Sequence, residues 1–224
     1  SIRRQRQMCI RDRLHKLRRI GGLPGHPDIG TPHMVTNTGS LGMGISKAKG
    51  MVLANRLQNR TGRVFVLTGD GELQEGQFWE SLISAVNLRM GEITVIVDHN
   101  KIQSDTWVSE TSGLGDLESK FEAFGMRVHR CNGNDIGELS TELVKIYKAD
   151  QPQVLIADTL KGAGVSFMEH PAVMQAENLY NYHSGAPTNS DYSEAVRELL
   201  GRLERRLADL NEKMVSVELS LIHI

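Results

Sequence analysis

Cysteine is scarce, because the 224 residues contain only Cys9 and Cys131. Two cysteines provide neither a disulfide framework nor a cysteine-rich metal site, so we expect a reducing, cytoplasmic setting. Long apolar runs and a signal-peptide pattern are also lacking, which gives no reason to expect a membrane partner. An excess of positive charge is lacking too, since 26 lysine and arginine residues are set against 27 acidic residues. Nucleic acid is therefore not expected as a partner.

What is present is the composition of a globular α/β domain, with strand-like and helix-like segments in alternation. Short β-branched runs predict strands at Val64–Thr68, Ile93–Asp98, Met126–Arg130 and Gln153–Thr159. Apolar residues at helical spacing predict helices at Ile45–Leu57, Phe78–Val86, Leu117–Phe124, Ile136–Tyr147 and Asp191–Leu210, and the end of a helix at Leu14–Ile20. This alternation favours a parallel sheet covered by helices on both faces. Residues 103–115 are polar and predict a mobile loop.

Two polar residues follow the first two predicted strands, and both are expected at the carboxyl edge of the sheet, where open α/β sheets bind ligands. The Asp70 carboxylate, the Asn100 amide oxygen and the main-chain carbonyl of Ile102 would give three hard oxygen ligands to a Mg²⁺-sized ion. Gly69 and Gly71 would let the backbone approach a diphosphate closely. The alternative is a simple Asp-Gly turn, with Asn100 capping the segment that follows.

The spacing of these motifs resembles that of the thiamine-diphosphate enzymes. Residues 69–76 read Gly-Asp-Gly-Glu-Leu-Gln-Glu-Gly and residues 98–103 read Asp-His-Asn-Lys-Ile-Gln, a combination similar to the transketolase branch. The resemblance covers nearly all of residues 14–200. It implies a three-layer α/β/α fold, N-terminally truncated here, that binds thiamine diphosphate with Mg²⁺, or with Ca²⁺ or Mn²⁺. It also implies transfer of a two-carbon ketol unit from a ketose phosphate to an aldose phosphate.

A glycine-rich loop, Thr38–Gly44, leads directly into a predicted helix, which is a natural anion site. Its spacing is not Gly-x-Gly-x-x-Gly, which weakens a nicotinamide-binding alternative. The loop resembles the Thr-Gly-Ser-Leu-Gly loop of transketolases. The resemblance breaks just upstream, where the family pattern is closer to Thr-Pro-Gly-Val-Glu and this chain has His33, Met34 and Val35.

Other stretches add candidate site residues. His26 lies in Gly-His-Pro-Asp, His183 in His-Ser-Gly-Ala-Pro and Lys161 in Lys-Gly-x-Gly, although a loop histidine or lysine is often only solvated. The resemblance implies that both histidines address phosphate and substrate hydroxyls, and that Glu75 lies at a subunit interface. It thus implies catalytic roles for His26, His183 and Glu75, and cofactor contacts from Gly39, Ser40, Leu41, Gly69, Asp70, Gly71, Glu72, Asn100, Lys161 and His183.

Both ends of the chain resemble translated sequencing adapter. Residues 3–12 match the in-frame translation of a transposase adapter, and residues 219–224 match the reverse complement of its last part. We therefore expect residues 1–13 and 215–224 to be artefacts and residues 14–214 to be an incomplete N-terminal transketolase domain. The alternative for the first segment is a basic arm.

In the family that the chain resembles, the cofactor lies between two domains, and the second one donates a glutamate to the aminopyrimidine ring. No such domain fits after Thr188, so we expect a pyrimidine-binding partner domain or subunit, a homodimer or heterotetramer, and no activity from this chain alone. The rival functions are a 1-deoxyxylulose-5-phosphate synthase, a 2-oxoacid dehydrogenase E1 chain and a non-catalytic cofactor-holding subunit.

Overall fold

The computed structural model describes residues 16–147, 151–177 and 179–210. The two predicted adapter segments, residues 1–13 and 215–224, lie outside the described residues. The described residues fall into two compact units, one made of residues 40–185 and the other of the parts before and after it.

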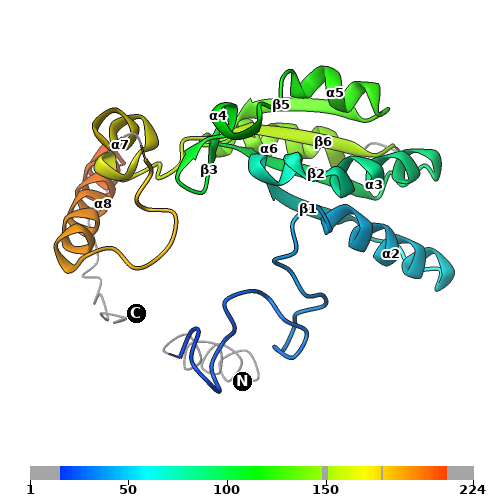
Figure 1. Ribbon diagram of the computed structural model, residues 1–224, viewed down its shortest axis with the longest axis horizontal. Coiled ribbons are helices and arrows are strands. Elements are labelled where there is room, and N and C mark those ends of the chain that lie inside the picture. Colours follow the sequence, from blue (N-terminus) through cyan, green and yellow to red (C-terminus); the bar gives the residue numbers. More distant parts are fainter. Residues whose placement is uncertain (1–15, 148–150, 178, 211–224) are drawn as a thin grey trace. The chain divides into compact units, whose positions relative to one another are not determined.

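A four-stranded parallel sheet in the order β1-β2-β6-β5 forms the centre of residues 40–185 (Figure 1). Its strands are β1 (Val64–Gly69), β2 (Ile93–His99), β5 (Arg127–Asn132) and β6 (Gln153–Asp158). The two central strands, β2 and β6, are almost fully buried, which matches their unbroken runs of β-branched and aliphatic residues. All four predicted strands and the parallel sheet are confirmed.

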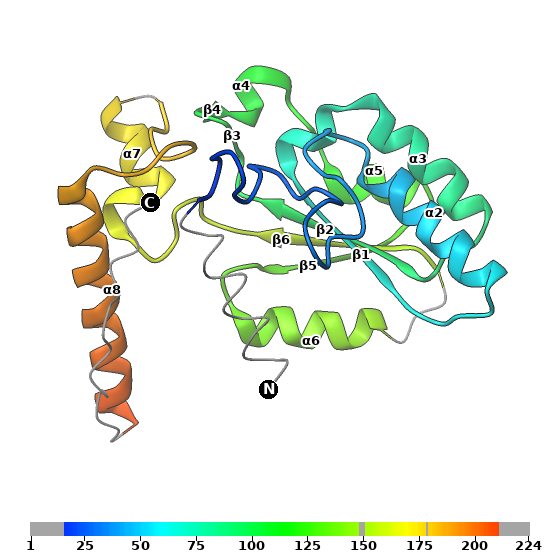
Figure 2. The ribbon, with the colours of Figure 1, turned by 90° about the horizontal axis from the view of Figure 1, so that it is seen from below.

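Helices lie on both faces of this sheet (Figure 2). Side chains of α2 (Gly44–Leu57), α3 (Gly76–Asn87) and α5 (Leu117–Ala123) share one buried cluster with Val95 and Val97 of β2. The opposite face packs against α6 (Ile136–Tyr147) through Ile146 and Leu155. Successive side chains of each strand point to opposite faces of the sheet, as the two-residue period of a β-strand requires. The predicted three-layer arrangement is therefore confirmed.

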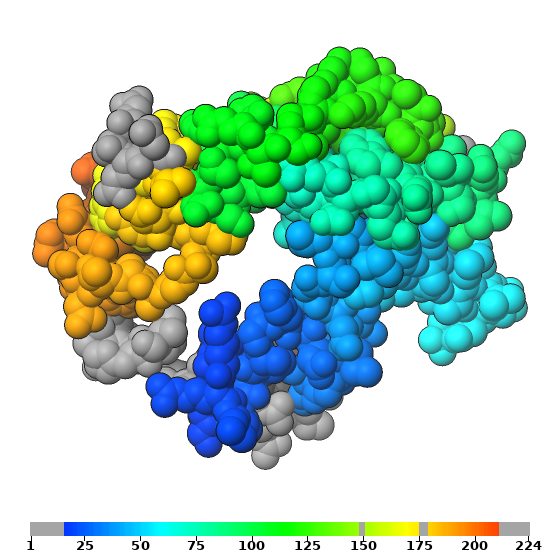
Figure 3. All heavy atoms as spheres, viewed as in Figure 1, coloured from blue at the N-terminus to red at the C-terminus, as the bar shows by residue number. Residues whose placement is uncertain are grey.

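The core between α3 and α5 is aromatic. Phe78 and Trp79 of α3 both pack against Phe121 of α5, and Trp79 also packs against Phe124, with ring centroids 5.1 to 6.0 Å apart. The Phe78–Trp79 and Phe78–Phe121 pairs are edge-to-face, a geometry that adds attraction to the burial of apolar area. The residues of α2, α3 and α5 form a continuous surface in the space-filling view (Figure 3).

The α6 face of the sheet is only partly covered within residues 40–185. Phe65 and Leu67 of β1 point to this face and are 49% and 74% exposed. The cause is that α6 packs over β5 and β6, where Cys131 and Leu155 meet it. Cys131 is buried near the end of β5.

Residues 102–115 are more structured than the predicted loop. A hairpin pairs β3 (Ile102–Gln103) with β4 (Thr106–Trp107), and α4 (Val108–Ser112) follows. Ile102 packs in a buried cluster with Val173, Met174 and Tyr180, residues far away in the sequence. These long-range contacts explain why a polar stretch folds into a hairpin. The cluster involves α7 (His170–Glu177), a helix that the periodicity did not predict.

The second unit contains turns and one long helix. Residues 16–22 form turns rather than the predicted helix end, because Arg18 has a φ of +60° and Gly21 a φ of +76°. The helix α8 (Asn189–Asp209) starts at Thr188, whose hydroxyl accepts a hydrogen bond from the Asp191 amide at 3.2 Å. None of its described side chains is buried within the structure, and the helix itself confirms the prediction for Asp191–Leu210. Among the described helices, none has the length and apolarity that a membrane crossing needs.

Candidate functional site

A pocket of about 790 Å³ opens at the carboxyl edge of the sheet, where β1, β2 and β6 end. Its walls come from residues after each of these strands and from the β3–β4 hairpin. The sequence-predicted residues that line it are Leu41, Gly69, Asp70, Gly71, Glu72, Asn100, Ile102, Lys161 and His183. The structure therefore brings together most of the predicted cofactor and metal residues.

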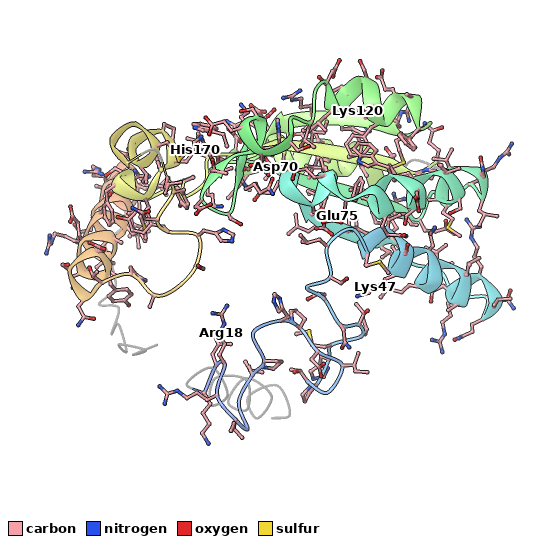
Figure 4. All side chains as sticks on the ribbon, in the orientation of Figure 1. Arg18, Lys47, Asp70, Glu75, Lys120 and His170 are labelled. Atoms are coloured by element: carbon pink, nitrogen blue, oxygen red, sulfur yellow. The ribbon has the colours of Figure 1, made fainter. Side chains whose placement is uncertain are left out.

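Asp70 is the most deeply buried charged group of the pocket, with 1% of its surface exposed (Figure 4). It begins the short 3-10 helix η1 (Asp70–Gln74), directly after β1. Its carboxylate accepts hydrogen bonds from the amides of Gly71 and Lys101. Burial raises the pKa of Asp70, against the lowering effect of the Lys101 hydrogen bond. A cation next to this carboxylate would favour its charged form.

Asn100, only 9% exposed, lies immediately after β2. Its Nδ2 donates to a carboxylate oxygen of Asp98 at 3.1 Å, and its Oδ1 accepts from the amide of Ile102 at 3.0 Å. The Asp98 carboxylate can only accept and the Ile102 amide can only donate, so these two partners determine which atom of the Asn100 amide is the oxygen and which is the nitrogen. One lone pair of Oδ1 remains for another contact.

The chemistry of these groups fits a magnesium diphosphate. No cluster of three histidine, cysteine or acidic residues suited to a metal exists in the described part of the chain. One carboxylate, one amide oxygen and main-chain carbonyls leave positions for phosphate oxygens and water, the usual arrangement for Mg²⁺. The Oε1 atom of Gln103, which also lines the pocket, is buried and has no hydrogen-bond partner among the described residues. A buried acceptor of this kind suits a ligand or a metal-bound water.

Lys161 supplies positive charge to the pocket, and the His183 imidazole lies beside it. The Nζ atom of Lys161 donates to the carbonyl of Ser104 at 3.0 Å, and it lies 3.1 Å from Nδ1 of His183. An ammonium group can only donate, so Nδ1 accepts and the imidazole proton is on Nε2. Burial lowers the pKa of both side chains, and for His183 the charge of Lys161 lowers it further. His183 thus offers an N–H donor to the pocket.

His170, which is labelled in Figure 4 and was not predicted from the sequence, holds Lys161 in place through two hydrogen bonds. Its Nδ1 accepts a hydrogen bond from the Lys161 amide at 3.1 Å, and its own amide donates to the Lys161 carbonyl at 2.9 Å. The side chain is 5% exposed, and burial lowers its pKa. The sequence gives no signal for this role, because His170 begins a helix that was not predicted and belongs to no recognised motif.

Glu72 links the glycine-rich loop to the end of β1. Its two carboxylate oxygens accept hydrogen bonds from the amide of Gly42 at 2.8 Å and from the hydroxyl of Thr68 at 2.7 Å. The side chain lines the pocket, but these two partners give it a role in shaping the loop. A direct cofactor contact from Glu72 stays a prediction.

Gly42 is expected to tolerate no side chain. Its φ is +74°, and a Cβ there would lie 2.8 Å from the Cβ of Glu75. We expect Gly42→Ala to lower the free energy of unfolding by on the order of 1–3 kcal/mol, the usual cost of a left-handed non-glycine residue. The melting temperature should fall by about 2–4 °C per kcal/mol.

Gly50→Ala is the matched control for this experiment. Gly50 is an exposed residue inside α2, with nothing within 4 Å of an added Cβ, and alanine there should be neutral or stabilise the helix by roughly 0.5–1 kcal/mol. Equal melting temperatures for Gly42→Ala and the wild type would contradict the described loop conformation.

The remaining predicted site residues are not pocket-lining residues in this structure. Glu75 is exposed just before α3, where its interface role stays a prediction. Ser40 is exposed and does not line the pocket. His26 and Gly39 belong to the other unit, where a Cβ on Gly39 would lie 2.9 Å from the His26 ring. In the same unit His33 has a φ of +71°, at a position where the family pattern has glycine.

The chain matches the family model described as transketolase, thiamine diphosphate binding domain, over residues 8–203. It is 38% identical over 178 residues to one subunit of the apulose-4-phosphate transketolase of Actinobacillus succinogenes, covering 79% of this chain and 62% of the relative. It is 33% identical to the subunit of the same name from Phocaeicola vulgatus, covering 85% of this chain and 66% of the relative. The chain therefore spans less than two thirds of these relatives.

Two further comparisons agree with these. The chain is 36% identical over 149 residues to the 6-deoxy-6-sulfo-D-fructose transketolase subunit SqwG of a Clostridium species, covering 66% of this chain and 54% of the relative. Among solved structures, a Campylobacter jejuni transketolase has a TM-score of 0.67 and 26% sequence identity, covering 88% of this chain and 35% of that chain. Sequence and fold thus point to the same kind of protein.

Proposed function

The chain belongs to the transketolase family, as its thiamine-diphosphate-binding domain, and we propose that the carboxyl-edge pocket holds the diphosphate of this cofactor through a divalent cation. The observation that carries the proposal is the buried Asp70 carboxylate beside the Asn100 amide at the end of two neighbouring parallel strands. The proposed ligands are Asp70, Asn100 and the carbonyl of Ile102, with Mg²⁺ as the preferred ion and Ca²⁺ or Mn²⁺ as substitutes.

Other residues of the chain would bind and orient. Lys161 and the Nε2–H group of His183 are proposed to meet phosphate oxygens or substrate hydroxyls, because both are donors that line the pocket. Gly69 and Gly71 leave room for backbone approach, and Leu41 contributes an apolar wall. When bound, thiamine diphosphate supplies the electron sink that lets a ketose carbon–carbon bond break.

We propose a ketol transfer between anionic sugars as the reaction. One relative is named for a phosphorylated sugar and another for a sulfonated sugar, so an anionic ketose is the class to test. The rival 1-deoxyxylulose-5-phosphate synthase and 2-oxoacid dehydrogenase functions would take a 2-oxoacid donor instead. A non-catalytic holding subunit would accept neither.

A second subunit or domain is proposed to complete the site. Two observations support this: relatives that align with most of this chain are named as subunits, and the pocket has groups suited to a diphosphate and a metal. The proposed partner supplies the surface for the aminopyrimidine ring, in a homodimer or a heterotetramer. Glu75 is a candidate contact with it, because it is exposed before α3.

Thiamine diphosphate with Mg²⁺ is expected to raise the melting temperature of the chain. A ligand at 100 times its dissociation constant stabilises the folded state by about 2.7 kcal/mol. For a domain of this size that corresponds to a shift of about 5–10 °C. Differential scanning fluorimetry at increasing cofactor concentration measures it.

Three conditions serve as controls for the thermal shift: NADH, thiamine without phosphates, and thiamine diphosphate with EDTA. None of them should produce the shift, because each lacks either the thiamine diphosphate itself or the bridging metal. A shift with NADH and none with thiamine diphosphate would overturn the proposed cofactor and favour the nicotinamide alternative.

A further inference from the structure

Asp98 lies at the end of β2 and forms two hydrogen bonds across the carboxyl edge of the sheet. One carboxylate oxygen accepts from Nδ2 of Asn100 at 3.1 Å. The other accepts from the hydroxyl of Thr159, which follows β6 directly. Asp98 is paired in register with Gly69 of β1 and Ala157 of β6, so it is held from both neighbouring strands.

The side-chain amide of Asn100 is the group that this arrangement controls. An asparagine amide can rotate by a half turn and exchange its oxygen for its nitrogen at nearly the same place. Only the oxygen can bind a cation. A carboxylate accepts hydrogen bonds and an amide N–H donates them, so Asp98 attracts Nδ2 while the Ile102 amide attracts Oδ1.

We propose that Asp98 is a positioning residue that fixes the Asn100 amide, so that Oδ1 and not Nδ2 is the atom offered to a divalent cation. The inference rests on the proposed function for the identity of the cation, and on the hydrogen bonds of the described residues for the geometry. Residues that orient metal ligands through hydrogen bonds commonly change metal affinity by about 10–100-fold when they are replaced.

The role differs from that of Asp70. Asp70 is 1% exposed and bonded to two backbone amides, while Asp98 is half-buried and bonded to two side chains. Asp98 therefore acts through Asn100, and its effect should depend on whether Asn100 is present. That dependence separates a positioning role from direct cation binding and from a general role in folding.

The test is a double-mutant cycle on the full chain, with Asp98→Ala, Asn100→Ala and the double variant. Calorimetry measures the apparent affinity for Mg²⁺ at a fixed concentration of thiamine diphosphate. We expect Asp98→Ala to weaken it by about 10–100-fold in the wild-type background. In the Asn100→Ala background the same change should matter by less than about twofold, because the group that Asp98 positions is already gone.

Two further variants add a conservative replacement and a matched control to the double-mutant cycle. Asp98→Asn keeps an oxygen that can accept from Asn100 and should recover part of the affinity. Asp116→Ala is the matched control, since it also removes one negative charge and its hydrogen bonds, but at the exposed N-terminus of α5. It should leave the Mg²⁺ affinity unchanged even if the chain melts at a lower temperature.

A measurement without cofactor completes the test. The side-chain NH₂ signal of Asn100 in a ¹⁵N–¹H NMR spectrum should shift and exchange faster with water in Asp98→Ala, and much less in Asp98→Asn. An unchanged signal, or an equally large loss of Mg²⁺ affinity in both backgrounds, would overturn the positioning role. Absence of any Mg²⁺-dependent binding by the wild-type chain would instead reject the proposed function, while the NMR signal would still decide the role of Asp98.

Discussion

The 224-residue chain by itself is expected to catalyse no detectable ketol transfer, and activity is expected to appear only when a pyrimidine-binding subunit is added. The described pocket carries donors and oxygen atoms that would hold the proposed diphosphate and its metal. In the proposed division of the site, the thiazolium and the aminopyrimidine ring are enclosed by other surfaces. A cofactor that stays partly in water binds more weakly, because less of its surface is buried and fewer of its polar groups are paired.

The assay uses xylulose 5-phosphate as donor and ribose 5-phosphate as acceptor, with thiamine diphosphate and Mg²⁺. The chain is assayed alone, with a pyrimidine-binding subunit of a split transketolase, and with an unrelated protein at the same concentration. Pyruvate replaces the ketose in a parallel series, which tests the two rival enzyme classes. Turnover of the ketose by the chain alone would contradict the proposed division of the site, and turnover of pyruvate only would contradict the ketol-transfer function.

The sheet and its edge could be predicted from local patterns. The β-branched runs that became β1, β2 and β6 place Asp70 and Asn100 after neighbouring strands, and a parallel sheet brings such positions to one edge. The resemblance then added Lys161 and His183, which the structure places in the same pocket. For Asp70 and Asn100, position along the chain was enough, because strand ends fix where the residues that directly follow them lie.

The parts that could not be predicted depend on contacts between distant residues. The packing of Ile102 on α7 stabilises the β3–β4 hairpin. The local polar pattern of residues 103–115 does not predict that contact. The hydrogen bonds of His170 to the backbone of Lys161 could not be predicted from the sequence either. Asp98 belongs to the motif of residues 98–103, but its proposed role could be inferred only from its hydrogen bond to Asn100.

At residues 16–22 the local pattern predicted a helix that the structure does not have. The sequence there contains good helix formers, and a helix end was predicted. The structure instead closes a loop, with the amide of Arg18 donating to the carbonyl of Leu23 at 2.8 Å. Positive φ values at Arg18 and Gly21 are incompatible with a continuing helix. Local propensity is a weak prior when glycines and a proline follow within a few residues.

Replacing Asp70 by alanine is expected to abolish the Mg²⁺-dependent binding of thiamine diphosphate. Asp70 is the buried carboxylate of the proposed ligand set, and without it the protein would offer the cation only neutral oxygens, so the main electrostatic attraction between cation and chain would be lost. We expect affinity to fall beyond measurement for Asp70→Ala and by a smaller but still large factor for Asn100→Ala, whose amide oxygen is neutral. Asp70→Asn keeps the size of the side chain and should bind nearly as poorly as Asp70→Ala, because the charge is gone.

The deciding measurement is a calorimetric titration of thiamine diphosphate into the wild-type chain and into Asp70→Ala, each in Mg²⁺ and in EDTA. Asp116→Ala serves as the control for loss of one surface carboxylate, and circular dichroism checks that each variant is folded. The proposed site predicts heat of binding only for the wild type and the control, and only in Mg²⁺. Normal binding of thiamine diphosphate by folded Asp70→Ala in the presence of Mg²⁺ would contradict it.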